Sequence, residues 1–252
     1  MKKIALALTL LIATLLPVPS SAQRRIIDTS KPDKILTVGA RIGLNSSGMD
    51  NNYLSLLSDM IQNNFYWRMG GQIGGVVDLH FRKFFALETG VFWELRNYEC
   101  ALMSANYVDD YMGSMFVHSR ANYLNFPVVA SFRLNIIPQS VWHFDLGIYY
   151  AYGLSGKKKT HQYYAFSDEN GQLIFDQQID KTNYFKAQAK DFLAVGHSDF
   201  GLRIGTGITF LDHYFIGVYY QRGLKNIAKN IEGTAKVKLN NVNWHVNIGY
   251  NF

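Results

Sequence analysis

The chain has 252 residues, a formal net charge of +6 and a single cysteine; 48% of its residues are hydrophobic and only 17% are charged. This composition excludes a disordered chain, a coiled coil and a disulfide framework, which need more charge, a heptad-like bias or more cysteines. The mild positive excess gives no indication of nucleic acid as a partner.

The first residues have the organisation of a secretion signal. Lys2 and Lys3 are followed by an apolar run, residues 4–16, and by a cleavage site of small residues, residues 20–22. The apolar run is shorter than the roughly 20 residues of a membrane-spanning helix. We therefore expect residues 1–22 to be cleaved, residues 23–34 to form a short periplasmic segment, and residues 35–252 to form one domain.

Eight segments alternate apolar and polar residues with a period of two, which predicts strands with one apolar and one polar face. They are residues 35–45, 72–81, 85–96, 123–134, 142–154, 199–210, 214–221 and 241–252. The alternation is unbroken in the last of them. It is least regular in residues 214–221, because Phe215 and Tyr219 interrupt the polar face. Most of these segments have the length of about 9–11 residues that a tilted strand needs to cross a bilayer.

The connections between these segments alternate strictly in length. The short ones are residues 82–84, 135–141 and 211–213, and the long ones are residues 46–71, 97–122, 155–198 and 222–240. Short periplasmic turns and long extracellular loops are typical of an outer-membrane barrel. The sequence therefore predicts an all-β fold: an eight-stranded antiparallel up-and-down transmembrane β-barrel in the outer membrane of a Gram-negative bacterium. A soluble carrier of the lipocalin type is the alternative, but nothing would gather its long loops at one end.

Aromatic residues stand at the ends of the predicted strands, where amphipathic rings favour the membrane interface. The predicted periplasmic girdle contains Phe81, Phe85, Trp142, Phe210 and Tyr214, and the opposite belt contains Trp93, Tyr150, Tyr152 and Tyr220. Tyr250 and Phe252 at the end of the last strand are predicted to form the signal for the barrel-assembly machinery. Strand propensity alone is the simpler explanation of such aromatics.

The polar face of the strands carries charges of both signs. These are Arg41, Asp78, His80, Glu88, Glu94, Arg96, Arg133, Asp145, Asp199 and Arg203. Eight strands enclose a space that side chains roughly fill, and buried charges must be paired. We therefore expect a salt-bridged, closed lumen, with a proton or small-ion path as the alternative. Glycines on the same polar face of the strands would make room for long side chains. Pro127 should mark a bulge or a missing hydrogen bond between neighbouring strands.

The long connections contain three further signals. Residues 53–66 have approximately helical spacing of apolar residues, which predicts a short amphipathic helix. Asn170-Gly171 between two apolar runs predicts a β-hairpin that extends beyond the membrane. The lysines at 157–159 lie just above the membrane, where they would contact lipopolysaccharide phosphates or remain solvated. Cys100 is expected in a long outer loop.

The sequence favours a protein without catalytic activity. His118-Ser119 and His197-Ser198-Asp199 bring catalytic residue types together, but adjacent strand residues point to opposite faces. No group of histidines and acids has a recognised metal-ligand spacing, so neither a metal nor another cofactor is expected.

Most of the chain after the signal resembles the PorT-like outer-membrane β-barrel family of Bacteroidetes. The resemblance rests on ARIGLNSS (40–47), LETGVFWELRNYE (87–99), NYLNFPVVASFRL (122–134), FDLGIYYAYGLSG (144–156), SDFGLRIGTGITF (198–210), YYQRGLKNIAKN (219–230) and NIGYNF (247–252). These motifs are structural and carry no catalytic residues with them.

The resemblance implies a scaffold, and the founding member of the family is implicated in type IX secretion. Three functions therefore remain open: a structural or interaction barrel, an accessory of a protein-export machine, and an outer-membrane lipid-modifying enzyme. The expected partners are outer-membrane lipid and lipopolysaccharide, the barrel-assembly machinery and, in the second case, secretion-system proteins.

Overall fold

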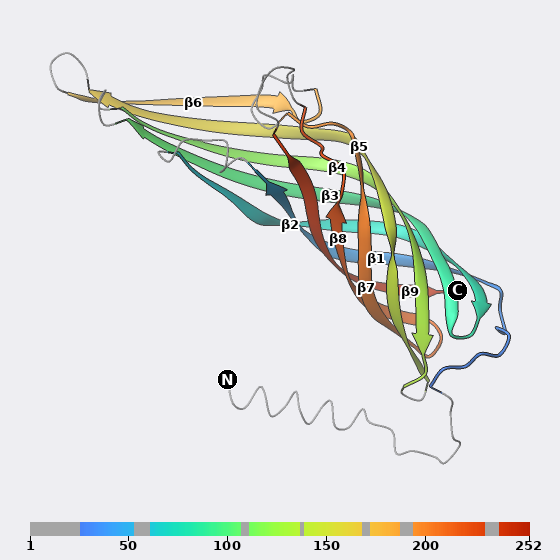
Figure 1. Cartoon of the computed structure of the whole chain (residues 1–252). Helices are drawn as coiled ribbons and strands as arrows, with labels where there is room; N and C mark the ends of the chain where they lie inside the picture. The colour runs from blue at the N-terminus through green and yellow to red at the C-terminus, as the bar shows by residue number, and fades with distance from the viewer. Residues whose placement is uncertain are drawn as a thin grey trace, which may run out of the picture.

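A computed structural model describes residues 26–52, 61–106, 111–136, 139–167, 172–186, 194–229 and 237–252 (Figure 1). The strands are β1 (Leu36–Asn51), β2 (Ile61–Arg82), β3 (Phe85–Asn106), β4 (Tyr111–Leu134), β5 (Ser140–Ser167), β6 (Leu173–Asn183), β7 (Ser198–Phe210), β8 (Tyr214–Gly223) and β9 (Leu239–Asn251). The predicted signal, residues 1–22, lies outside the described residues.

Eight of the strands form a closed antiparallel ring. The order of hydrogen-bonded neighbours is β4-β3-β2-β1-β9-β8-β7-β5, and pairing of β4 with β5 closes the ring. All eight segments predicted from alternation lie in these strands, apart from the end residues Ile35 and Phe252, so the predicted barrel is confirmed. β6 is outside the ring and pairs with β5.

The alternation of side chains separates a lipid-facing surface from a packed interior. Every second residue of β8 from Phe215 to Gln221 is buried, and the residues between them are exposed or intermediate. The exposed positions of the ring are apolar, including Leu44, Ile73 and Leu146, each more than half exposed. An apolar outer band and a polar interior are the arrangement that a membrane-spanning barrel requires.

Much of the chain predicted as long loops is strand. β2, β3, β4 and β5 continue past the ring on one side and, together with β6, form an extracellular sheet (Figure 1). Register shifts occur between Arg68 and Gln72 of β2 and between β4 and β5, where Asn122 faces Ser155 and Tyr123 faces Gly153, so that β5 carries the extra residue. Both lie where the sheet leaves the ring. Because a bulge bends and twists its strand, we expect these two irregularities to turn the sheet away from the ring.

The structure corrects three local predictions in this region. Residues 61–66 of the predicted amphipathic helix belong to β2, and residues 53–60 lie outside the described residues. Cys100 is a buried residue of β3 rather than a loop residue. The two arms of the predicted hairpin pair, with Ser167 opposite Leu173, whereas the predicted turn at Asn170-Gly171 lies outside the described residues. The second arm is the separate strand β6 and not an extension of the sixth predicted barrel strand.

Pro127 lies in β4 and interrupts its ladder with β3. Pairing is continuous up to Thr89 opposite Val128 and resumes with Phe92 opposite Asn125 in the same register. The Thr89 hydroxyl donates to the Pro127 carbonyl at 3.0 Å. The ladder between β3 and β4 is therefore interrupted at Pro127, which is one of the two outcomes that the sequence predicted. The other outcome, a bulge, does not occur there.

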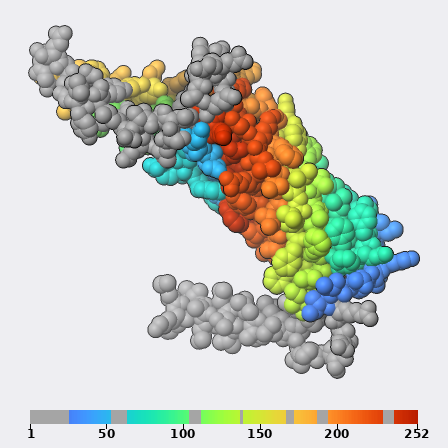
Figure 2. All heavy atoms as spheres, in the orientation of Figure 1, coloured from blue at the N-terminus to red at the C-terminus, as the bar shows by residue number. Residues whose placement is uncertain are grey.

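Residues 26–35 lie along the end of the ring where the short turns gather (Figure 2). The Asn135 amide donates to the Ile26 carbonyl at 2.9 Å, and the Lys83 amide donates to the Ser30 carbonyl at 3.2 Å. This segment therefore joins two neighbouring hairpins at the periplasmic end. In the described part of the chain, no helix has the length and apolar content needed to span a bilayer.

Candidate functional site

The interior of the ring is filled by large polar and aromatic side chains. Those that are almost completely buried include Arg96, Arg203, Tyr123, Tyr149, Tyr219, Phe92, His245 and Gln221. An eight-stranded ring has room for side chains and little else. The described interior is therefore a packed polar core.

Arg96 is the centre of the strongest charge cluster in the lumen. Its guanidinium lies 2.8 Å from Glu94 Oε2 and 3.1 Å from Asp199 Oδ2, and all three side chains are fully buried. Asp199 also accepts hydrogen bonds from the Tyr149 hydroxyl at 3.0 Å and from the Asn241 amide at 2.9 Å. The Arg96 guanidinium lies over the Tyr123 ring at 4.5 Å. This cluster joins β3, β4, β5, β7 and β9 across the lumen.

A second cluster lies at the periplasmic end. Arg133 Nη2 donates to Asp78 Oδ2 at 2.8 Å, and Arg133 Nη1 donates to His80 Nδ1 at 3.1 Å. These groups border a hollow of about 1100 Å³ that is also lined by Asp33 and Lys83 of the periplasmic end. The lumen is therefore open to the periplasm down to the level of this ion pair.

Arg41 and Arg203 are held mainly by aromatic rings. Arg41 lies 4.3 Å from the centre of the Phe215 ring and donates to Asn251 Oδ1 at 2.7 Å. Arg203 lies 4.0 Å from the centre of the Tyr219 ring, and none of its three guanidinium nitrogens has a hydrogen-bond partner among the described residues. Phe215 and Tyr219 are the two residues that made β8 look irregular in sequence. An aromatic residue at an inward-facing, otherwise polar position of a strand was therefore a signal for a cation–π contact with a lumen arginine.

Glycines provide the space for these rings. A Cβ atom added to Gly205 would lie 2.2 Å from a ring carbon of Tyr219, and one added to Gly207 would lie 2.7 Å from the Phe215 ring. Such distances are well inside van der Waals contact. Glycine at these positions is therefore required by the two aromatic–arginine stacks.

The remaining predicted lumen acids do not form ion pairs within the described chain. Asp145 Oδ2 accepts a hydrogen bond from the Tyr219 hydroxyl at 3.0 Å. Glu88 is buried directly opposite Asp78 on the neighbouring strand, so two acids share one part of the lumen. The structure thus brings Glu94, Arg96 and Asp199 together, and Asp78, His80 and Arg133 together. It places Arg41, Glu88, Asp145 and Arg203 in the same interior without direct ion pairs.

The predicted girdle residues lie around the periplasmic end and contact further aromatic rings. The ring centres of Phe85 and Phe132 are 5.3 Å apart, and those of Trp142 and Phe144 are 5.7 Å apart. Phe81 and Phe210 are exposed. Tyr214 lies 5.5 Å from Tyr250, which in turn lies 5.4 Å from Phe252. The backbone amide of Phe252 donates to the Val38 carbonyl at 2.8 Å, beside the seam between β1 and β9.

An apolar cluster fills the extracellular end of the ring. Tyr98, Tyr123, Tyr149 and Leu239 of the strands pack with Tyr184, Phe185, Val195 and Ile227 of the outer connections. The Tyr123 and Phe185 rings lie 5.5 Å apart, and the Tyr98 and Tyr184 rings stack at 6.2 Å. Burial raises the pKa of the Tyr184 hydroxyl well above its ordinary value. This cluster lies outside the Arg96 cluster and separates it from the cell exterior.

Cys100 belongs to this apolar cluster, and its burial predicts low reactivity. Burial raises the pKa of the Cys100 thiol to about 12, so very little thiolate is present near neutral pH. At pH 8 we expect Cys100 to react with maleimide about a thousandfold more slowly than an ordinary thiol with a pKa of about 8.5. The rate should still rise with pH above 9. Arg120→Cys in a Cys100→Ala chain is the exposed control, and equal rates at the two positions would contradict the buried placement.

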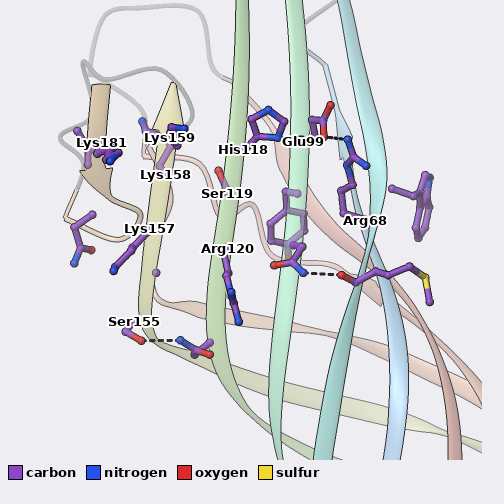
Figure 3. A pocket seen from close by; sticks show the side chains of 18 residues that line it. Arg68, Glu99, His118, Ser119, Arg120, Ser155, Lys157, Lys158, Lys159 and Lys181 are labelled. Carbon is purple, nitrogen blue, oxygen red and sulfur yellow. Dashed lines mark hydrogen bonds and ion pairs between the residues drawn. The ribbon is translucent and has the colours of Figure 1, made fainter. Parts of the chain in front are cut away.

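The outer face of the extracellular sheet is strongly basic (Figure 3). A hollow of about 1360 Å³ on this sheet is lined by residues that include Arg68, Arg120, Lys157, Lys159, Lys181 and Glu99. Glu99 forms an ion pair with Arg68, and its Oε2 lies 3.2 Å from His118 Nδ1. We call Arg120, Lys157, Lys159 and Lys181 the basic face; the sequence signalled only its two β5 lysines.

The catalytic residue types noted in the sequence have separate partners. His118 is exposed and pairs with Glu99, whereas Ser119 is buried on the opposite face of β4. His197 Nδ1 hydrogen-bonds the Gly153 carbonyl at 2.7 Å, and Asp199 is bound to Arg96. Within the described ranges, no three histidine, cysteine or acidic side chains gather as possible metal ligands.

Residues 21–229 match the family described as the outer membrane protein beta-barrel domain. The chain belongs to this family. It is therefore a β-barrel protein of the outer membrane of a Gram-negative bacterium, as the sequence predicted. The match covers β1 to β8.

Comparison with solved structures finds other outer-membrane barrels at low sequence identity. The attachment invasion locus protein Ail of Yersinia pestis, in complex with the heparin analogue sucrose octasulfate, is 12% identical over 87% of this chain and 100% of its own, with a TM-score of 0.36. The outer membrane protein OprG of Pseudomonas aeruginosa is 9% identical over 91% of this chain and 99% of its own, with a TM-score of 0.40. No curated protein matches the chain.

Proposed function

We propose that this protein is a closed, non-enzymatic barrel that holds an extracellular β-sheet at the cell surface as an interaction surface. The observation that carries the proposal is the sheet itself, formed by the outer parts of β2, β3, β4 and β5 together with β6. A ring that only anchored itself in the membrane would not need these strands. Ordering these strands costs conformational entropy, and strands outside the bilayer bury less apolar surface to offset that cost. We therefore infer that the strands have a role outside the membrane.

The packed lumen supports an interaction role over a transport role. The Arg96 cluster and the apolar cluster lie in series along the ring, and their side chains are buried. A solute would have to displace paired charges and aromatic rings together, which is energetically costly. The proposed partners are outer-membrane lipid and lipopolysaccharide at the sheet, with the barrel-assembly machinery acting during insertion.

β6 extends this surface into water. All eleven residues of the strand are exposed, and Phe175 is 78% exposed. Long exposed strands with apolar residues are uncommon unless a partner covers them. The hairpin of β5 and β6 is therefore the part of the sheet whose removal tests the proposal best.

The test is complementation of a gene deletion. Lys158 and Thr182 are directly opposite each other, so an Asn-Gly turn can replace residues 159–181 without changing the register below them. We expect this shortened chain to insert normally but to leave the envelope as permeable to large antibiotics as the deletion does. The full chain should restore the barrier. Full restoration by the shortened chain would overturn the proposal.

An accessory role in protein export is the second candidate, and the periplasmic hollow favours it. The hollow is lined by charges of both signs, including Asp33, Lys83 and Arg133, and it lies where a periplasmic partner would meet the barrel. This role, together with membership of the PorT-like family of Bacteroidetes, rests on resemblance in sequence. Secreted, surface and periplasmic proteomes of the deletion strain test it. Cargo that accumulates in the periplasm and clears on complementation would favour export over the first proposal.

A further inference from the structure

The basic face consists of two cross-strand pairs of like charge. Arg120 of β4 is directly opposite Lys157 of β5, and Lys159 of β5 is directly opposite Lys181 of β6. Like charges directly opposite each other destabilise a sheet. The four cations lie within an area of roughly 10 Å by 7 Å, given the spacing of strands and of residues along them.

No acidic side chain compensates these cations in the part of the chain that the structure describes. Glu99, the acid that lines the same hollow, is bound to Arg68 and His118. The ion pairs of the described chain include none with Arg120, Lys157, Lys159 or Lys181. An anion from outside the chain would therefore relieve the repulsion.

The basic face continues the lipid-facing surface of the ring. Trp93 of β3 and Tyr152 of β5, whose rings are exposed, each lie directly opposite Leu124 of β4 at the outer edge of the apolar band. Arg120 precedes Leu124 by four residues in β4, so it lies on the same face of the strand and farther toward the extracellular side. Allowing for strand tilt, this places it roughly 10 Å beyond the aromatic residues. Long basic side chains can extend from there to the headgroup region.

We propose that the basic face binds the phosphate groups of an outer-leaflet lipid, with the acyl chains against the apolar band and the phosphates between Arg120, Lys157, Lys159 and Lys181. The continuity of the two surfaces favours a lipid over a soluble anion, because a soluble ligand would gain nothing from the apolar band. This inference rests on the proposed interaction function and names the partner of its sheet. Figure 3 shows the lysines of β5 and β6 beside Arg120 and His118 of β4.

The test compares two double variants that remove the same charge from the extracellular side. Lys157→Gln with Lys159→Gln changes the basic face, and Lys186→Gln with Lys238→Gln changes two exposed lysines that do not line the hollow. Each basic residue beside an anionic lipid surface contributes about a factor of five to affinity, so the first variant should bind phosphorylated lipid A about thirtyfold more weakly. The control variant should bind like the original chain. Lys157→Arg with Lys159→Arg should retain binding.

Binding is measured by native mass spectrometry of the folded barrel in detergent, after heat-modifiable gel migration has verified folding of every variant. Four probes are used: phosphorylated lipid A, dephosphorylated lipid A, inorganic phosphate and a sulfated polysaccharide. The inference requires that only phosphorylated lipid A binds tightly and that this binding weakens with salt. The inference is overturned if dephosphorylated lipid A binds as tightly as phosphorylated lipid A, or if inorganic phosphate binds the site equally well. It is also overturned if the lysine substitutions weaken binding of the polysaccharide alone.

Failure of the inference is distinguishable from failure of the proposed function. If the lysine variants bind lipid normally but the shortened hairpin still fails to complement, the inference is wrong and the interaction function stands. If lipid binding depends on the lysines but the shortened hairpin complements fully, the site stands and the proposed function is wrong.

Discussion

Replacing Arg96 with methionine should lower the free energy of unfolding by about 3–5 kcal/mol, the usual cost of removing one partner of a buried ion pair. The Arg96 guanidinium contacts both Glu94 and Asp199, and all three side chains are fully buried. Without it, two acids remain close together in the lumen with no cation in direct contact. Urea unfolding in detergent, followed by heat-modifiable gel migration, measures the change.

Two further variants define the origin of this loss. Arg68→Met removes an ion pair with Glu99 whose arginine is 51% exposed, and it should cost about 1 kcal/mol or less. Arg96→Met combined with Glu94→Gln and Asp199→Asn removes the buried charges together, and it should recover most of the stability. If the triple variant is no more stable than Arg96→Met alone, packing of the guanidinium rather than charge is responsible.

Arg203 provides a comparison within the same lumen. The sequence predicts a salt-bridged lumen in which Arg203 has an acidic partner, but the structure places Arg203 over the Tyr219 ring at 4.0 Å with no ion pair among the described residues. A desolvated cation–π contact contributes about 2 kcal/mol. We therefore expect Arg203→Met to cost less than Arg96→Met. The opposite order would mean that the overall charge balance of the lumen matters more than direct contacts.

The sequence predicted the ring because the bilayer imposes one pattern on every strand that crosses it. A strand between lipid and a polar lumen must alternate, as residues 241–252 do without interruption. Beyond the membrane this constraint disappears. Lys157, Lys158 and Lys159 follow one another in β5, and every residue of β6 is exposed, so neither segment has an alternation to detect. The extracellular sheet was therefore predicted as loops.

The lumen residues were recognisable from sequence, whereas their partners were not. The alternation of apolar and polar residues indicated that Arg96 and Asp199 face inward. They are 103 residues apart in the chain and meet because of the registers of β3 and β7 around the ring. Register depends on hydrogen bonding between strands rather than on composition. The contacts of Arg41 with Phe215 and of Arg203 with Tyr219 were missed because inward-facing aromatics were read as irregularities of the pattern.

Removal of Phe252 should leave the majority of the protein unfolded in cells, although the rest of β9 is unchanged. The Phe252 amide donates to the Val38 carbonyl, and its exposed ring contacts Tyr250 beside the seam between β1 and β9. The deletion removes both the hydrogen bond and the ring. Heat-modifiable migration of outer-membrane fractions measures the folded share.

Two substitutions at the same position separate these contributions. Phe252→Ala keeps the backbone hydrogen bond and removes the ring, whereas Phe252→Trp keeps an aromatic ring at the membrane interface. If the assembly machinery recognises the ring, Phe252→Ala should assemble as poorly as the deletion, and Phe252→Trp should assemble normally. If Phe252→Ala assembles normally while the deletion does not, closure of the seam by the backbone is the requirement. Normal assembly of the deletion itself would remove Phe252 from the assembly signal, because neither its amide nor its ring would then be needed to bring β9 beside β1.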